Sequence, residues 1–195
     1  MGFIKNNVQA LGPGNRIAVW FAGCPRRCKG CVSPELQVST PMQECDIIKR
    51  IRHENLCGIT GLTVSGGEPF MQTEALLLLV EYFKDKGIDD ILVFTGYTLA
   101  ELRARNDAAT TAALNAIAVL VDGEYEEDSD VGQRLAGSSN QVMHFLNDAY
   151  RAEYEEYCKQ PRAVQTSLLN GVYYFVGLPP KGKAEQLRNS IRSKR

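Results

Sequence analysis

Residues 17–31, IAVWFAGCPRRCKGC, join an uninterrupted apolar run to three closely spaced cysteines. Five apolar residues in a row are typical of a strand that is covered on both faces. In α/β proteins, the loops that follow parallel strands lie at the edge of the sheet where ligands bind. This stretch therefore predicts a buried strand that delivers Cys24, Cys28 and Cys31 to a ligand site.

Further apolar runs alternate with helical patterns along the chain. Residues 62–64, 91–94 and 117–121 are predicted as buried strands, and residues 47–54 and 73–86 as helices, the second ending at Gly87. Such alternation indicates parallel βαβ units in an α/β fold. At 195 residues the chain is long enough for one domain with a substantial core.

The pattern changes after residue 122. An acidic run at 122–130 is followed by a predicted helix at 148–158 and a predicted hairpin of 163–168 and 172–176 around Asn170 and Gly171. We divide the chain into a core (1–147), an extension of the same domain (148–180) and a basic tail (181–195). The tail is expected to be a solvated segment, with docking to a partner as the alternative.

Charge and hydropathy exclude some classes of partner. The 22 basic and 23 acidic side chains nearly cancel, so nucleic acid is not an expected ligand. The apolar runs are too short to span a membrane, and residues 1–9 lack the apolar core of a secretory signal. We expect a cytoplasmic protein, in which clustered cysteines bind a metal or cluster rather than forming disulfides.

The spacing of Cys24, Cys28 and Cys31 favours an iron-sulfur cluster. A four-iron four-sulfur cube is normally held by four thiolates, and no fourth cysteine continues the series nearby. The remaining cysteines, Cys45, Cys57 and Cys158, are isolated and are interpreted as small buried side chains without an assigned role. One iron would then be open to an exogenous ligand.

Two questions about this loop stay open at the level of sequence. A structural zinc site, completed by His53 or His144, is the alternative to a cluster. The basic residues Arg26, Arg27 and Lys29 either lower the pKa values of the thiols or are solvated surface charges.

A second motif, Ser65-Gly66-Gly67-Glu68-Pro69, follows the predicted strand at 62–64. Two glycines permit close backbone approach to a ligand, a carboxylate can receive an ammonium group, and proline stiffens the turn. A plain strand-to-helix turn would use similar residues. The motif therefore indicates a ligand site strongly only in combination with the cysteine loop.

Together the two motifs resemble the radical S-adenosylmethionine superfamily. The resemblance implies that Cys24, Cys28 and Cys31 hold one 4Fe-4S cluster whose open iron chelates S-adenosylmethionine. It implies that Gly66, Gly67, Glu68 and Pro69 line the methionine end of this cofactor. Reductive cleavage would then yield a 5′-deoxyadenosyl radical.

Within the superfamily, the chain is most similar to the activating proteins of anaerobic ribonucleotide reductases. The segments that carry this resemblance are Gly12-Pro13-Gly14, Gly30 before the last cysteine, residues 94–98 (FTGYT), residues 120–123 (LVDG) and residues 137–141 (GSSNQ). The resemblance places Gly30 and Val32 near the adenine and Thr95 at the end of the third strand. It gives Asp122 a role near the partner's glycyl loop, with a simple turn as the alternative.

The resemblance also carries expectations about fold and partners. It implies an incomplete (β/α)6-type partial TIM barrel, with the cluster at the carboxyl-terminal mouth and reduced by a flavodoxin-like donor. The expected reaction is formation of a glycyl radical on an anaerobic ribonucleotide reductase. Two alternatives remain: a radical enzyme acting on a small molecule or peptide, and an iron-sulfur electron-transfer module without catalysis.

Overall fold

The computed structural model describes residues 2–38, 44–130, 132–169 and 172–180, together with residues 183 and 186. Its strands are β1 (Phe3–Val8), β2 (Arg16–Phe21), β3 (Gly61–Gly66), β4 (Asp90–Phe94), β5 (Val119–Asp122), β6 (Val142–Phe145), β7 (Val164–Leu169) and β8 (Val172–Gly177). The α-helices are α1 (Glu44–Ile51), α2 (Thr73–Lys84), α3 (Leu99–Ala104), α4 (Ala108–Ala116) and α5 (Arg151–Cys158). Single 3-10 turns are η1 (Pro34–Leu36), η2 (Pro69–Met71), η3 (Glu127–Ser129) and η4 (Asp148–Tyr150).

The main sheet has six strands in sequential order from β1 to β6. Strands β2 to β5 are parallel, whereas the edge strands β1 and β6 run antiparallel to their neighbours. This mostly parallel sheet confirms the predicted α/β class. The register pairs Phe21 with Gly66, so the loops after β2 and β3 leave the sheet side by side.

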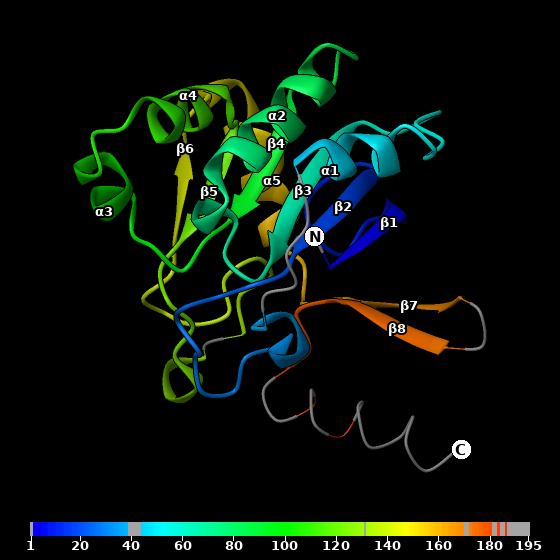
Figure 1. The fold of residues 1–195 in the computed structure, drawn as a ribbon. Coiled ribbons are helices and arrows are strands. Elements are labelled where there is room, and N and C mark those ends of the chain that lie inside the picture. Colours follow the sequence, from blue (N-terminus) through cyan, green and yellow to red (C-terminus); the bar gives the residue numbers. More distant parts are fainter. Residues whose placement is uncertain are drawn as a thin grey trace.

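Helices α1 to α4 cover one face of the sheet (Figure 1). Alternate residues of β2, namely Ile17, Val19 and Phe21, face these helices and pack in one core with Leu79 and Phe83 of α2. Each such fully buried side chain contributes about 1.5–3 kcal/mol by leaving water. The apolar alternation within β2 therefore determines which face receives the helices.

The opposite face is covered by the extension. Tyr154 and Tyr157 of α5 pack against Leu92 and Val119 of the sheet. Val176 of β8 joins a separate core with residues of β1 and β2. Figure 1 shows the β7–β8 hairpin apart from the main sheet, near the end of β2 from which the cysteine loop departs.

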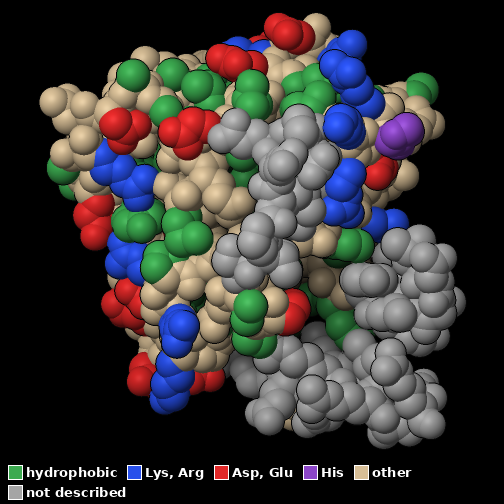
Figure 2. All heavy atoms as spheres, in the orientation of Figure 1, with side chains coloured by type: hydrophobic (Ala, Val, Ile, Leu, Met, Phe, Trp, Pro, Cys, Tyr) green, Lys and Arg blue, Asp and Glu red, His purple; other side chains and the backbone are tan. Residues whose placement is uncertain are grey.

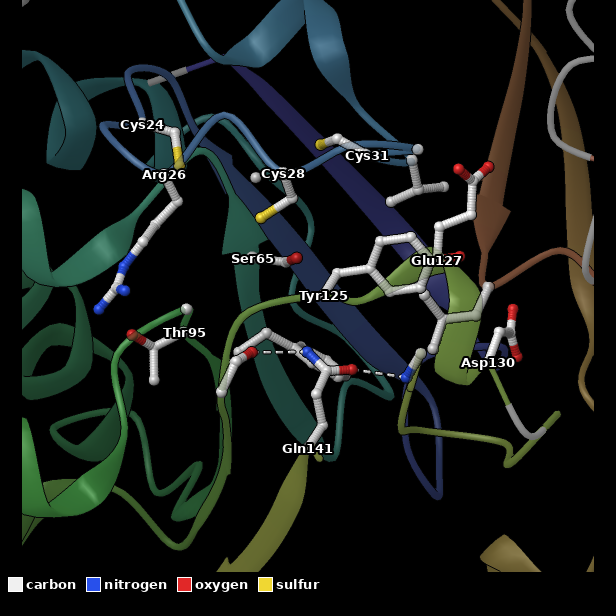
Figure 3. Close-up of a pocket in the computed structure, with 18 of the residues that line it drawn as sticks. Cys24, Arg26, Cys28, Cys31, Ser65, Thr95, Tyr125, Glu127, Asp130 and Gln141 are labelled. Carbon is white, nitrogen blue, oxygen red and sulfur yellow. Dashed lines mark hydrogen bonds between the residues drawn. The ribbon is translucent and has the colours of Figure 1, made fainter. Parts of the chain in front are cut away.

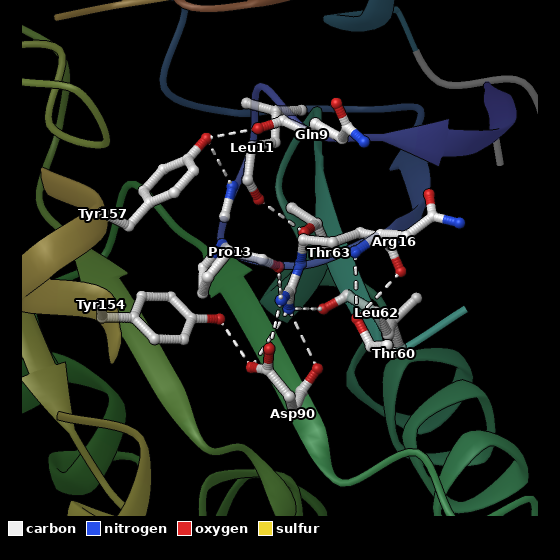
Figure 4. Close-up of polar contacts among 12 residues, drawn as sticks. Gln9, Leu11, Pro13, Arg16, Thr60, Leu62, Thr63, Asp90, Tyr154 and Tyr157 are labelled. Carbon is white, nitrogen blue, oxygen red and sulfur yellow. Dashed lines mark hydrogen bonds and ion pairs between the residues drawn. The ribbon is translucent and has the colours of Figure 1, made fainter. Parts of the chain in front are cut away.

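A buried guanidinium connects three strands at the amino-terminal end of the sheet (Figure 4). Arg16 of β2 is fully buried and forms an ion pair with Asp90 of β4. Its Nε donates to Thr63 Oγ1 of β3 at 2.7 Å, and its other donors reach the carbonyls of Pro13 (3.0 Å) and Leu62 (2.8 Å). Tyr154 of α5 donates to the same Asp90 carboxylate at 2.7 Å. The network therefore ties the Gly12-Pro13-Gly14 turn, the sheet and the extension together.

The predicted strands and helices are present, with ends shifted by a few residues. Sequence periodicity missed β1 and β6, whose residues are mostly half-exposed, and the short helices α3 and α4. These two helices begin at caps: Thr98 forms a capping box with Glu101, and Asp107 accepts from the Thr110 amide. The predicted hairpin is β7–β8, but its turn at Asn170 and Gly171 lies outside the described residues, as does the tail apart from 183 and 186.

Charges of both signs are interspersed over the face shown in Figure 2, in keeping with the near-zero net charge. Basic side chains gather at its right edge, where Figure 1 places α1, whose last turn carries Lys49 and Arg50. Within the described ranges, none of the helices combines the length and apolar character needed to cross a bilayer.

Removing the charge of Asp90 tests the buried network. We expect Asp90→Asn to lower the free energy of unfolding by about 3–5 kcal/mol, because Arg16 is left buried without its counter-charge. The matched control is Asp89→Asn: the Asp89 side chain is 55% exposed, and its carboxylate lies 3.5 Å from Lys84. This control should change stability by less than about 1 kcal/mol. Urea unfolding measures both, and equal effects would contradict the role of the network.

Candidate active site

A cavity of about 510 Å³ lies at the carboxyl-terminal ends of the parallel strands. This volume is within the range of small-molecule sites, about 300–1,000 Å³. Its lining comes from the loops after β2, β3 and β4, from the β5–β6 loop, and from residues 162 and 178–180 of the extension. Figure 3 shows the cysteines along one rim of this cavity.

The loop after β2 brings all three predicted cysteines to the cavity. Backbone hydrogen bonds hold its ends: Gly23 N–H donates to Leu36 O at 2.7 Å, and Cys24 N–H donates to Gln37 O at 3.2 Å. Within the loop, Cys31 N–H donates to Cys28 O at 3.3 Å. The cysteine loop therefore folds back on itself, and its three thiols lie on the same side of the cavity.

The glycine motif after β3 is joined directly to the cysteine loop through the backbone. Gly67 N–H donates to Phe21 O at 2.7 Å, and Glu68 N–H donates to Gly23 O at 2.8 Å. A Cβ on Gly66 would lie 2.3 Å from Phe21 O, and one on Gly67 would lie 2.1 Å from Gly23 O. Side chains are therefore excluded at both positions, and Gly66 in addition has a φ of 107° that favours glycine.

Glu68 is buried and connects the glycine motif to the end of β4. Its Oε1 accepts hydrogen bonds from Phe70 N–H (3.0 Å) and Thr95 Oγ1 (2.8 Å), and its Oε2 accepts from Gly96 N–H (2.8 Å). Burial raises the pKa of this carboxyl group, and the hydrogen bonds from Gly96, Phe70 and Thr95 oppose that effect. A carboxylate has about four acceptor positions, so these three bonds leave one for a further donor.

Two of the thiols, those of Cys28 and Cys31, lie in an environment that favours their protonated form. Burial raises the pKa of Cys28 to about 11, with a further contribution from the Glu124 carboxylate, and burial also raises the pKa of Cys31. Backbone hydrogen bonds from Tyr125 to Cys28 and from Ser33 to Cys31 act in the opposite direction. Of the two interpretations of the basic residues that the sequence left open, lowered pKa values do not fit these two thiols.

Two of the three basic side chains of the loop, Arg26 and Lys29, face other partners. The guanidinium of Arg26 stacks on the Tyr97 ring at 4.4 Å and pairs with Glu101 (3.2 Å) and Glu124 (3.5 Å). Figure 3 shows Arg26 directed away from the Cys28 and Cys31 sulfurs. Lys29 is largely exposed and lies 3.7 Å from Glu127. Arg26 therefore anchors the loop to α3 and the β5–β6 loop instead of serving the thiols.

Most of the predicted cofactor-binding residues line this one cavity: Gly30, Val32, Gly66, Gly67, Glu68 and Thr95. Two predicted residues do not line it. Pro69 is buried at the start of η2, where it shapes the turn. Asp122 is also buried: its Oδ2 accepts from Leu99 N–H at 2.6 Å and lies 2.8 Å from His144 Nε2.

Tyr125, Gln141 and Arg162 also line the cavity but were not among the predicted site residues. Gln141 holds the β5–β6 loop in shape, because its Oε1 accepts from Gly137 N–H (2.6 Å) and its Nε2 donates to Gly123 O (2.8 Å). The segment 137–141 carries part of the family resemblance, which was a signal for Gln141. Tyr125 lies within the acidic run and Arg162 beyond the core, and neither stands out by spacing.

The donor set fits an iron-sulfur cube better than a zinc ion. His144 is engaged with Asp122, and His53 follows α1; neither lines the cavity. Among the described residues, no three His, Cys, Asp or Glu side chains stand close enough together to hold a single metal ion. A cube instead spreads its ligands, since each thiolate binds a different iron. Backbone amides directed at two of the sulfurs are also typical of such clusters.

Comparison with known proteins agrees with this geometry. Residues 10–144 match the family model described as a 4Fe-4S single cluster domain. An anaerobic ribonucleoside-triphosphate reductase-activating protein of Vibrio cholerae is 38% identical over 143 residues, which cover 68% of this chain and 89% of that protein.

Two further relatives extend the comparison. The protein of the same name from Escherichia coli K12 is 34% identical over 145 residues, 69% of this chain and 91% of its own length. A pyruvate formate-lyase-activating enzyme of Streptococcus mutans is 36% identical over 88 residues, which cover 42% of this chain and 34% of that enzyme. The similarity to the first two proteins therefore covers nearly their whole length.

Substitution of each cysteine tests the ligand assignment. Cys24→Ala, Cys28→Ala and Cys31→Ala should each lose the cluster, because a cube held by three thiolates cannot spare one. Iron and sulfide analysis after anaerobic reconstitution measures this. Cys158→Ala, which alters a half-buried thiol on α5, is the control and should retain both elements. A full complement of iron in the Cys28 variant would disprove the assignment.

A methyl group at residue 67 tests the backbone contact between the two motifs. We expect Gly67→Ala to cost about 1–3 kcal/mol, because its Cβ would collide with the Gly23 carbonyl. The control is Gly58→Ala, where no atom lies within 4 Å and only the positive φ is strained, at about 1 kcal/mol. Urea unfolding compares them, and a smaller loss for Gly67→Ala than for Gly58→Ala would contradict this contact.

Proposed function

Because this chain belongs to the 4Fe-4S single cluster domain family and to the anaerobic ribonucleoside-triphosphate reductase-activating proteins, we propose that it generates a glycyl radical on such a reductase. A 4Fe-4S cluster with bound S-adenosylmethionine supplies the 5′-deoxyadenosyl radical for this reaction. The observation that carries the proposal is the single cavity shared by three cysteines and the Gly66-Gly67-Glu68 segment.

The residues of the cavity divide the task of holding these groups. Cys24, Cys28 and Cys31 would bind three irons and leave the fourth open. Gly66 and Gly67 present bare backbone at the cavity, so a ligand can approach it closely. The remaining acceptor position of Glu68 suits an ammonium group, as in the methionine part of S-adenosylmethionine. Gly30, Val32 and Thr95 line the same cavity.

Asp122 has no direct part in this proposal. Both described interactions of its carboxylate, with Leu99 N–H and His144, are structural, and the residue does not line the cavity. Asp122 therefore acts as a turn residue and not as a group that faces the partner's glycyl loop. Its buried contacts hold the start of α3 against the end of β5.

We also propose a flavodoxin-like protein as the electron donor. Cys24 lines both the main cavity and an adjacent surface groove, which includes Pro25, Arg27, Val38 and Met71. A donor seated on this groove would lie next to a cluster ligand, which favours electron transfer. We also propose a cytoplasmic location for the protein. Five cysteines are free thiols, as expected in a reducing compartment: Cys24, Cys28, Cys31, Cys57 and Cys158.

The sheet topology supports, as a proposal, the partial barrel expected from the family. The strands follow one another in sequential order, and the helices that connect the parallel strands, α1 to α4, lie on one face, which is the winding of a barrel. In doubly wound sheets the connecting helices lie on both faces. Helix α5, on the opposite face, follows the last strand of the sheet and connects no parallel strands. The polar Arg16, Thr63 and Asp90 side chains would then lie inside the amino-terminal end. The cavity would occupy the opposite, open end.

Anaerobic turnover tests the function. The protein, reconstituted with iron and sulfide and reduced in the presence of S-adenosylmethionine, should form 5′-deoxyadenosine, which chromatography detects. Addition of the anaerobic ribonucleotide reductase from the same genome should give a glycyl radical signal by electron paramagnetic resonance. Bound iron without cleavage, even with this reductase present, would instead support an electron-transfer module.

A further inference from the structure

The extension contributes a buried arginine to the cavity. The side chains of Arg162 and Asp130 are each only 4% exposed and form a two-pronged ion pair, with Nη1 to Oδ2 at 2.9 Å and Nη2 to Oδ1 at 2.7 Å. Both residues line the cavity. This geometry matches the planar fork of a guanidinium to the two oxygens of a carboxylate.

The same guanidinium also binds backbone carbonyls of two other chain segments. Its nitrogens donate to Gln133 O (2.7 Å), Ala136 O (2.8 Å), Gly137 O (3.0 Å) and Pro179 O (3.2 Å). With the Asp130 carboxylate, these acceptors engage all three nitrogens of the group. Arg162 therefore connects the β5–β6 loop to the segment that follows β8.

A second arginine connects the same two regions in the opposite direction, from the β5–β6 loop to the extension. Arg134 of the β5–β6 loop donates to Pro161 O of the extension, and its guanidinium stacks on the Tyr157 ring of α5 at 4.1 Å. At the base of β8, a Cβ on Gly177 would lie 2.2 Å from Ala163 O. The end of β8 is thus packed closely against the residue next to Arg162.

These contacts hold residues 178–180, which we call the wall. Leu178, Pro179 and Pro180 line the cavity, yet both the wall and Arg162 lie beyond residues 10–144, the part that matches the family model. Figure 3 shows Asp130 on the side of the cavity across from Cys24, Arg26 and Thr95. The core therefore supplies the cysteine side of the cavity, and the extension completes the side around Asp130.

We propose that Arg162 is a positioning residue that fixes the wall, and that the wall determines how efficiently each cleavage of S-adenosylmethionine yields a glycyl radical. This role rests on the proposed function. Two consecutive prolines are stiff and carry no N–H group, so they form a rigid boundary that attracts little water. A reactive site gains from such enclosure, because water and buffer molecules that compete with the substrate are excluded.

The test compares three variants of the full chain. Arg162→Gln removes the charge and the fork, whereas Arg162→Lys keeps a charge for Asp130 but cannot reach all the carbonyls. Arg151→Gln is the matched control in the same extension, since that side chain is 48% exposed and pairs with Asp148 at the surface. Thermal unfolding checks first that each variant folds.

Hydrogen exchange by mass spectrometry measures the wall without any turnover. In Arg162→Gln, amides of residues 133–137 and 177–178 should exchange about tenfold or more faster, while β2 to β5 stay protected. Arg162→Lys should lie between Arg162→Gln and the wild type, and Arg151→Gln should match the wild type. Unchanged exchange in Arg162→Gln would overturn the assignment of Arg162 to the wall.

The coupling role is measured as the ratio of 5′-deoxyadenosine formed to glycyl radical formed with the reductase present. A merely destabilised protein loses both products together, whereas a released wall raises the ratio, by about threefold or more in Arg162→Gln. If Arg162→Gln shows faster exchange but a normal ratio, the proposal that the wall determines the yield of glycyl radical is overturned. Absence of 5′-deoxyadenosine from the wild type would overturn the proposed function and this role with it, while the exchange result would still decide whether Arg162 holds the wall.

Discussion

The close backbone contact between the end of β2 and the turn after β3 is the constraint on which the site depends. Gly67 and Glu68 donate to the carbonyls of Phe21 and Gly23 at 2.7 and 2.8 Å, so the two loops share one hydrogen-bonded edge. This approach requires the absence of side chains at residues 66 and 67. Cysteine loop and glycine motif, more than thirty residues apart in sequence, are thereby brought to the same cavity. Parallel pairing of β2 with β3 continues to Gly66 and sets the register of that contact.

Two buried arginines hold the opposite ends of this architecture. Arg16 joins β2, β3 and β4 through Thr63, Leu62 and Asp90 at the amino-terminal end. At the carboxyl-terminal end, Arg162 joins the β5–β6 loop to the wall. In both places a desolvated charge is matched by one carboxylate and several carbonyls, which is what offsets the cost of burial. The extension takes part in both, because Tyr154 contacts Asp90 and Arg162 itself belongs to it.

The environment of the thiols suggests how the cluster is held. Because burial raises the pKa values of Cys28 and Cys31, the protein alone does not maintain thiolates there. Iron binding must displace the thiol protons, so the metal itself provides the positive charge that stabilises the sulfur anions. The protein contributes the shape of the loop, which Arg26 anchors by stacking on Tyr97 and pairing with Glu101. Position, more than electrostatic activation, is the contribution of this loop.

The sequence by itself determined the α/β class, the central strands, the three cysteines and the glycine motif. These are local patterns: an apolar run of five residues, a spacing of three thiols, and two adjacent glycines are readable without knowing the fold. The edge strands β1 and β6 were not predicted, because their mostly half-exposed residues form no such apolar pattern. Only the tertiary structure decided the rest of the site. In the folded chain, Arg26 is directed away from the thiols, and Asp122 is buried outside the cavity. The fold also places Tyr125, Gln141 and Arg162 in the lining of the cavity. Their roles follow from which distant carbonyls and carboxylates lie within hydrogen-bonding distance, and such contacts between segments far apart in the chain exist only once the sheet and the extension have packed together.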